Sequence, residues 1–222
     1  MFLAWLLFDG GLCLAVHLGS IFGAGVALGA RVEAASFGFG PSLEKSWRGI
    51  KWRLGPLPLG GYVRFQGADP GAPPEPGAFS WLSRPRRALI DVSGCLALCL
   101  VAVFLLGPAR SWHGFSSAFA QALQIVLHPA AASALVGRWC SLLAGPAPLA
   151  LGMLATKVAA FNLLPLPALN GWALLRDLVR APGWRGPREG GFLDRWAPVL
   201  LLPGIAFAFC CSWSIISFAW SL

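Results

Sequence analysis

Two polar features interrupt the apolar runs of this chain and could support chemistry. The first is the stretch 162–171, which carries Asn162, Pro165, Pro167 and Asn170 between two apolar segments. Proline removes a backbone donor, so a helix break here inside a membrane leaves polar groups that lipid cannot satisfy. Such a break is tolerated only where protein or a small polar cavity covers it. The stretch is therefore a candidate binding site.

The second feature is His17, which lies within the long apolar run at the start of the chain. Cys13 precedes it by one helical turn and would share its face, so a Cys-x-x-x-His metal pair is geometrically possible. The alternative is a buried histidine that hydrogen-bonds to Asn162 or Asn170, with the cysteine acting as a small apolar residue. We favour this second interpretation.

The chain as a whole has the composition of an integral membrane protein. Its 222 residues are 57% hydrophobic and 12% charged, with a mean hydropathy of +0.68. The net charge of +8 does not indicate nucleic-acid binding, because the basic residues lie mostly in loops between apolar runs, with no basic helix or aromatic ladder. We therefore expect a lipid bilayer, and no nucleic acid, as a partner.

The apolar runs predict an α-helical polytopic membrane protein that forms a single membrane domain over residues 1–222. About four core transmembrane helices are expected, at residues 2–30, 88–106, 141–163 and 196–220. The uncharged segment 115–137 contains a proline well inside it and is predicted to be interfacial or re-entrant.

Residues 31–87, between the first two predicted spans, have short runs with strand-like composition that glycines and prolines interrupt. Strands are expected at 35–39, 50–54 and 62–65. The region is therefore predicted to form a small sheet, organised as a membrane-associated β-hairpin region after the first helix.

Basic residues predict the orientation in the membrane. Loop 31–87 holds nine Lys or Arg residues and loop 174–195 holds five, whereas segment 109–140 holds two. Basic loops tend to stay cytoplasmic, so a multi-pass protein with both rich loops in the cytoplasm and both termini outside is expected. Lys157 lies inside the third predicted span and marks a functional position by default. Its structural alternatives are snorkelling, or an ion pair with Asp91 or Asp9.

The order of short motifs resembles that of the site-2 proteases, which are intramembrane zinc metalloproteases. The stretch Phe-Asn-Leu-Leu-Pro-Leu-Pro-Ala-Leu-Asn-Gly at 161–171 is similar to the family motif Asn-x-x-Pro-x-Pro-x-Leu-Asp-Gly. Gly-Ala-Arg-Val-Glu at 29–33, Phe-Gly-Phe-Gly-Pro at 37–41 and Pro-Leu-Gly-Gly-Tyr-Val at 58–63 resemble family segments at similar spacing. About thirty residues separate the second and third predicted spans, too few for a PDZ domain, so the compact form is implied.

The resemblance places the family's catalytic residues on positions that differ in this chain. The first zinc-binding histidine falls on His17, the general-base glutamate on Leu18 and the second histidine on Ile21, while the aspartate ligand falls on Asn170. Leucine cannot accept a proton, isoleucine cannot coordinate a metal, and a catalytic zinc uses about three protein ligands. We therefore expect no catalytic residue and no cofactor, with zinc bound only if the site is rearranged and active.

Three functions stay open on this resemblance. The favoured one is an inactive homologue that binds a membrane protein or transmembrane segment as a regulatory or assembly subunit. The alternatives are an active intramembrane zinc metalloendopeptidase with a rearranged site and a structural subunit of a membrane complex. The expected binding residues are Asn162, Pro165, Pro167, Asn170, Gly60, Gly61 and Tyr62.

Overall fold

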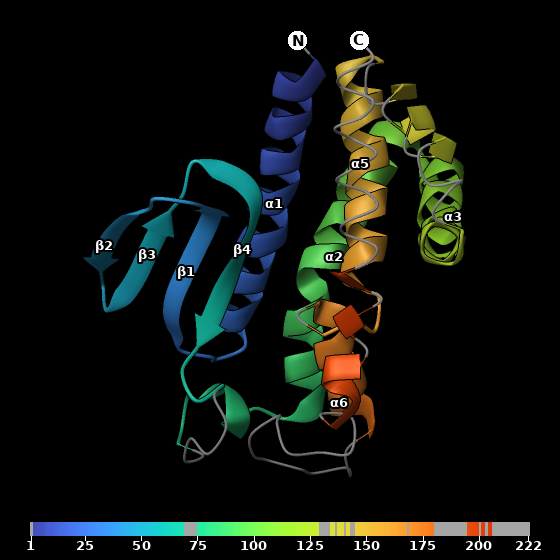
Figure 1. Cartoon of the computed structure of the whole chain (residues 1–222). Helices are drawn as coiled ribbons and strands as arrows, with labels where there is room; N and C mark the ends of the chain where they lie inside the picture. Colours follow the sequence, from blue (N-terminus) through green and yellow to red (C-terminus); the bar gives the residue numbers. More distant parts are fainter. Residues whose placement is uncertain are drawn as a thin grey trace.

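A small sheet and a group of helices lie on opposite sides of the first helix in the computed structural model (Figure 1). The structure describes residues 2–68, 75–128, 134–135, 137–139, 141–142, 145–167, 169–179, 195–199, 201–202 and 204–205. The elements are α1 (Phe2–Ala27), β1 (Val32–Phe39), β2 (Leu43–Trp47), β3 (Ile50–Leu54), β4 (Leu57–Phe65), the 3-10 turn η1 (Phe79–Trp81), α2 (Arg84–Leu106), α3 (Pro108–Leu127), α5 (Ala147–Asn162) and α6 (Asn170–Val179).

Two of the described helices, over Ala4–Ala27 and Arg84–Leu106, are long and apolar enough to cross a membrane. Helix α5 is apolar but has 16 residues, and most of the fourth predicted span, 196–220, lies outside the described residues. The chain is thus mostly helical with a small sheet and two candidate spans. The bundle of about four spans and its orientation stay predictions.

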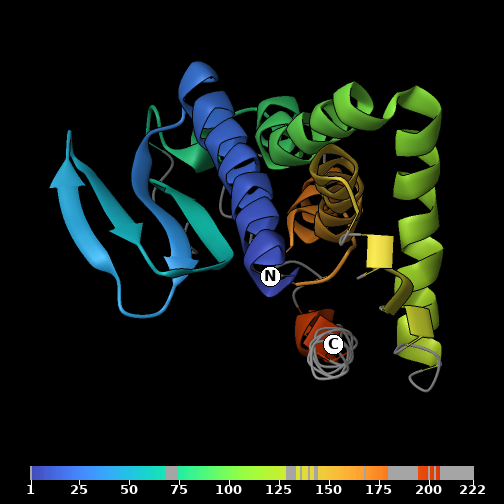
Figure 2. The same cartoon turned by 90° about the horizontal axis from the view of Figure 1, so that it is seen from above.

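The helices α1, α2 and α5 share one apolar core. Its buried members are Cys13 from α1, Cys95, Leu98 and Ala102 from α2, and Ala155 and Ala159 from α5. The small side chains on α5 let its backbone approach α2 closely, which is how helices associate where no water drives them together. Helix α3 lies on the far side of α5 from the sheet, and Figure 2 shows it lengthwise while α5 is seen nearly end-on.

The predicted strands are present as β1, β3 and β4, but the sheet is larger than expected. Within the described residues the strand order is β2-β3-β1-β4, with β1 antiparallel to β4 and parallel to β3. Strand β2 is not predicted from the sequence, because its five residues lack an alternation of apolar and polar side chains. In the structure all five are exposed. It joins β3 through Arg48 and Gly49, whose φ angles of 53° and 78° suit a tight hairpin turn.

The sheet packs on α1 through its edge strand β4. A Cβ on Gly11 would lie 3.3 Å from Pro58, and Gly25 leaves the space that the Phe65 ring occupies. Glycines on α1 therefore bring helix and strand into direct contact along much of their lengths.

Helices α1 and α2 are in direct contact at Gly94. A Cβ at this position would lie 2.5 Å from Nδ1 of His17 and 2.7 Å from the His17 carbonyl oxygen. Only glycine leaves room for the histidine there, so Gly94 determines how close the two helices come.

Replacing Gly94 by alanine should destabilise the protein, because overpacking of this kind costs about 1–3 kcal/mol. Thermal unfolding of the purified chain in detergent would give a lower midpoint than wild type. Gly19→Ala on α1 is the matched control, since nothing lies within 4 Å of its Cβ position. That variant should be neutral or slightly stabilising. An unchanged midpoint for Gly94→Ala would contradict the close contact.

Candidate functional site

The polar stretch predicted from the sequence forms the turn between α5 and α6. Helix α5 ends at Asn162 and α6 begins at Asn170. The turn is closed by backbone hydrogen bonds from Leu166 to Leu164 (2.8 Å) and from Leu169 to Leu166 (3.1 Å). Pro165 is exposed and Pro167 is half-buried on this turn.

Gly171 lies directly against the end of α5. A Cβ there would collide with the carbonyl oxygens of Leu163 and Leu164. The glycine thus lets the first turn of α6 cover the end of α5, which is where a broken helix leaves unsatisfied carbonyl groups. This close approach explains why glycine follows the asparagine in the motif.

The two asparagines of the stretch bind different partners. The Asn170 side-chain amide donates to the carbonyl oxygen of Asp91 on α2 at 2.6 Å, whereas Asn162 donates to Val158 within its own helix at 2.9 Å. Asn170 therefore fixes the start of α6 against α2.

The other end of α6 is held by arginines from the first turn of α2. Arg84 donates to the carbonyl oxygen of Leu178 at 2.7 Å, and Nε of Arg87 lies 3.6 Å from Oδ2 of Asp177. Arg87 is 0% exposed and Asp177 2%, so this ion pair is shielded from solvent. Together with Asn170 these contacts align α6 antiparallel to the first half of α2. Sequence reasoning treated the arginines only as topology signals and missed this role.

His17 is buried at 5% exposure, and its ring lies against the backbone of Gly94. Its Nδ1 has no hydrogen-bond partner within the described residues. The expected hydrogen bond to Asn162 or Asn170 is not formed through Nδ1, and both amides donate to backbone carbonyls.

The two family positions that follow His17 on α1 carry packing residues. Cδ1 of Leu18 lies 2.6 Å from where a Cβ on Gly61 of β4 would stand, so leucine and strand are in contact. Ile21 packs against an apolar cluster of Ala30, Phe65, Phe79, Leu82 and Ile90. Neither side chain offers a donor atom, and each fills space between α1 and its neighbours.

The residues at these positions do not fit a catalytic zinc. Ile21 has no ligand atom, and the neutral amide oxygen of Asn170 is not among the Cys, His, Asp and Glu atoms that zinc sites use. Cys13 is buried in the apolar core together with Cys95 rather than beside a third ligand. Within the described part of the chain, no group of three His, Cys, Asp or Glu residues is placed to hold a metal ion.

The remaining predicted binding residues lie on β4. The Phe39 ring lies where a Cβ on Gly60 would stand, Gly61 is pressed against the backbone of Ser36, and the Tyr62 side chain is exposed. Helix α1 contacts β4 through Leu18 and contacts α2 through His17. Helix α2 in turn accepts the hydrogen bond from Asn170. The structure thus connects the two predicted parts of the site through these helices.

Lys157 on α5 makes none of the expected acidic contacts. Its Nζ donates to the Gly114 carbonyl oxygen (3.0 Å), the Ser117 hydroxyl (3.3 Å) and the Gln121 side-chain oxygen (2.7 Å). All three acceptors come from α3, so the lysine attaches α3 to α5.

The described structure thus consists of an apolar helix with a buried histidine, a small sheet packed against it and a helix break that ends in an Asn-Gly turn. The sequence pattern of peptidase family M50 matches residues 11–189, and the chain belongs to this family, which includes the site-2 proteases.

Relatives with metalloprotease names share part of this sequence. A protein of Chlamydia trachomatis serovar D, named as a zinc metalloprotease, is 33% identical over 134 residues, which is 54% of this chain and 22% of that protein. One from Campylobacter jejuni, named likewise, is 38% identical over 84 residues, 36% of this chain and 23% of that protein. Metalloprotease MmpA of Caulobacter vibrioides is 41% identical over 70 residues, 30% of this chain and 17% of its own length. The match thus covers less than a quarter of each relative.

The buried ion pair should be needed to hold α6 in place. Asp177→Asn removes the carboxylate that faces the buried Arg87 guanidinium, and breaking a buried ion pair in this way costs about 3–5 kcal/mol, whereas Arg87→Met with Asp177→Leu should recover most of that loss. Chemical unfolding in detergent gives the free energy of unfolding of the single and of the double variant.

The matched control is Glu44→Gln, which removes the exposed ion pair of Glu44 with Arg53 (2.8 Å) on the sheet. Such a surface pair is worth about 0–1 kcal/mol. Equal losses for Asp177→Asn and Glu44→Gln would disprove a special role for the buried pair.

Proposed function

We propose that this chain is a catalytically inactive member of peptidase family M50 that binds a membrane protein as a regulatory or assembly subunit. The proposal rests on one observation above all. The three positions that would supply the base, the second histidine and the aspartate carry Leu18, Ile21 and Asn170, and each of these side chains has a structural contact of its own.

These contacts argue against a site that is merely rearranged. Leu18 lies against Gly61, Ile21 packs in an apolar cluster, and the amide of Asn170 donates to α2. A leucine at the base position leaves a metal-bound water without a proton acceptor. Restoring chemistry would require different residues as well as a different arrangement.

The proposed binding surface is the outer edge of β4, at the positions that α1 does not cover. This strand lies at one end of the sheet and pairs with β1 on one side only within the described residues. An unpaired strand edge offers a row of N–H and C=O groups to an extended segment, which can add as a further strand. The exposed Tyr62 side chain lies on this strand and interacts with Arg53 of β3, on the other side of β1.

The purified full chain should contain substoichiometric zinc and show no endopeptidase activity. Loss of the general base alone costs about 10²–10⁴ in rate. Metal analysis should give the same zinc content for wild type, for His17→Ala and for the exposed-histidine control His128→Ala. One equivalent of zinc that is lost in His17→Ala and kept in His128→Ala would favour the active, rearranged enzyme.

Strand addition can be tested by a proline scan from Tyr62 to Phe65. At solvent-facing positions whose N–H points away from β1, proline should abolish partner capture without destabilising the chain, because it removes only the bond to the partner. Phe65 is buried against Phe79, so proline at this last position should also destabilise the chain. Prolines at outward-facing positions of β2, the other edge strand, are the matched control and should leave capture intact.

Capture is measured by site-specific photo-crosslinking in native membranes. A crosslinker at position 62 should trap the partner, and one at Phe104, which is 88% exposed on α2, should trap lipid. Protein crosslinks from position 104 with none from position 62 would instead favour a structural subunit that packs through its helices.

A further inference from the structure

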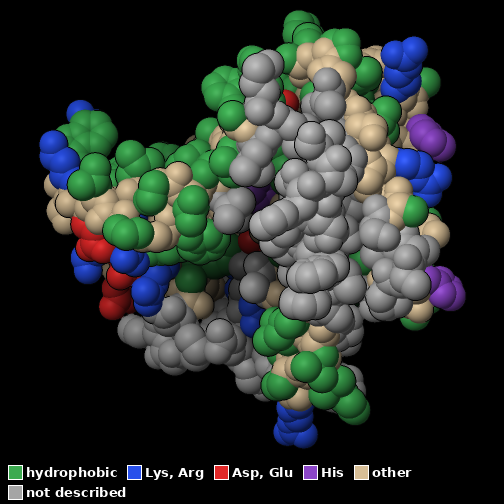
Figure 3. Space-filling view, turned by 45° about the horizontal axis from the view of Figure 1, so that its top comes forward, with side chains coloured by type: hydrophobic (Ala, Val, Ile, Leu, Met, Phe, Trp, Pro, Cys, Tyr) green, Lys and Arg blue, Asp and Glu red, His purple; other side chains and the backbone are tan. Residues whose placement is uncertain are grey.

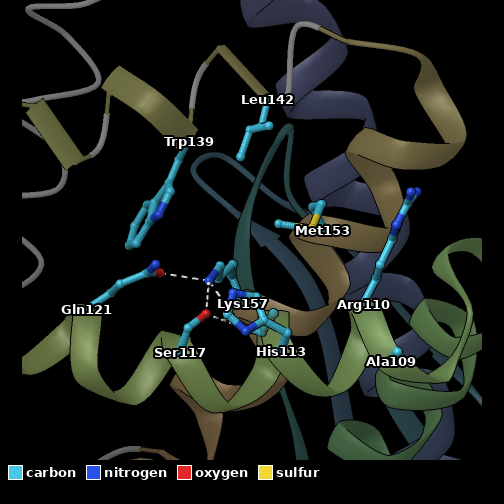
Figure 4. Close-up of a pocket in the computed structure, with 10 residues that line it drawn as sticks. Ala109, Arg110, His113, Ser117, Gln121, Trp139, Leu142, Met153 and Lys157 are labelled. Atoms are coloured by element: carbon cyan, nitrogen blue, oxygen red, sulfur yellow. Dashed lines mark hydrogen bonds between the residues drawn. The ribbon is translucent and has the colours of Figure 1, made fainter.

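A pocket of about 500 Å³ lies between α3 and α5, outside the site described above (Figure 4). Helix α3 contributes Arg110, His113, Ser117 and Gln121, and α5 contributes Lys157. Trp139 and Leu142 lie over these residues and Met153 lies beside Lys157. The pocket therefore has a mostly apolar wall, with the exposed residues Arg110 and His113 at its rim.

The charge of Lys157 is hydrogen-bonded but not neutralised. Its three donors reach a carbonyl, a hydroxyl and an amide oxygen of α3, all of which are uncharged acceptors. Its Nζ also lies 5.7 Å from the centre of the Trp139 ring. Keeping a cation in this partly buried position is costly, which marks it as a functional position.

Arg110 adds a second positive charge beside the pocket of Lys157. Arg110 and His113 line the same pocket, and no acidic side chain is among the described lining residues. Within the described part of the chain, neither the Arg110 guanidinium nor the His113 imidazole makes a hydrogen bond or ion pair. Their N–H donors are thus available to a ligand that brings negative charge.

The outer surface of α3 indicates where such a ligand would come from. Its polar residues Ser117 and Gln121 face α5, while Trp112 is 70% exposed, Leu123 59% and Leu127 61%. A helix with polar groups toward protein and apolar groups outward suits lipid surroundings. Figure 3 shows basic and histidine side chains gathered on the α3 side of the molecule.

We propose that this pocket binds the headgroup of an anionic phospholipid. The phosphate accepts hydrogen bonds from Arg110 and His113, and Lys157 supplies the compensating charge, as basic pockets between membrane helices do for acidic lipids. The volume exceeds what a free phosphate ion needs, and the indole and thioether side chains suit the glycerol and acyl region of an amphiphile.

Native mass spectrometry of the full chain in detergent tests this assignment. Phosphatidylglycerol should bind about tenfold more tightly than phosphatidylcholine with the same acyl chains, since a hydrogen-bonded charge pair contributes on this order. Arg110→Gln and Lys157→Gln should remove the preference, and Lys157→Arg should keep it. Arg110→Gln leaves the bonds between α3 and α5 intact, so its effect is not one of misfolding.

The matched control is Lys51→Gln, the same loss of charge at an exposed residue on β3, which should leave the preference unchanged. Equal loss in Lys51→Gln would reveal a general charge effect and overturn the assignment. Displacement of the lipid by millimolar inorganic phosphate would assign the pocket to free anions. Unchanged lipid binding in Lys157→Gln together with loss of a crosslinked protein would assign it to a partner segment. Either result would overturn the lipid proposal.

Discussion

The site depends on the close contact of α1 and α2 at Gly94. Because this residue has no side chain, the His17 ring rests on the α2 backbone, and α1 lies where Leu18 reaches β4. The same helix α2 then holds α6 through Asn170 and through a buried arginine. A larger side chain at this one position would move the histidine-bearing helix relative to every other part of the site.

The positions that the family resemblance assigns to catalysis carry Leu18, Ile21 and Asn170 in this fold. A metal site needs donor atoms in a partly polar cavity, whereas Leu18 and Ile21 fill their positions with apolar contacts. Asn170 is still polar, and its side-chain amide donates a hydrogen bond to a backbone carbonyl of α2. The interactions that hold the elements together are therefore separable from those that would perform proteolysis.

The two polar regions of this apolar chain are satisfied in different ways. The turn between α5 and α6 is closed by its own backbone bonds and by contacts to α2. Lys157, by contrast, relies on neutral oxygen atoms of α3, so its positive charge persists in the pocket. The first arrangement stabilises the fold, while the second leaves an electrostatic potential that a ligand can use.

The sequence by itself determined the features that depend on short stretches of chain. These are the apolar helices α1, α2 and α5, strands β1, β3 and β4 and the break after Asn162, because periodicity and proline positions are local. Only the tertiary structure decided the parallel pairing of β1 with β3, the buried pair of Arg87 with Asp177 and the partners of Lys157. Those contacts join residues far apart in the chain, and a buried charge is indistinguishable from a loop charge until packing brings its partner near.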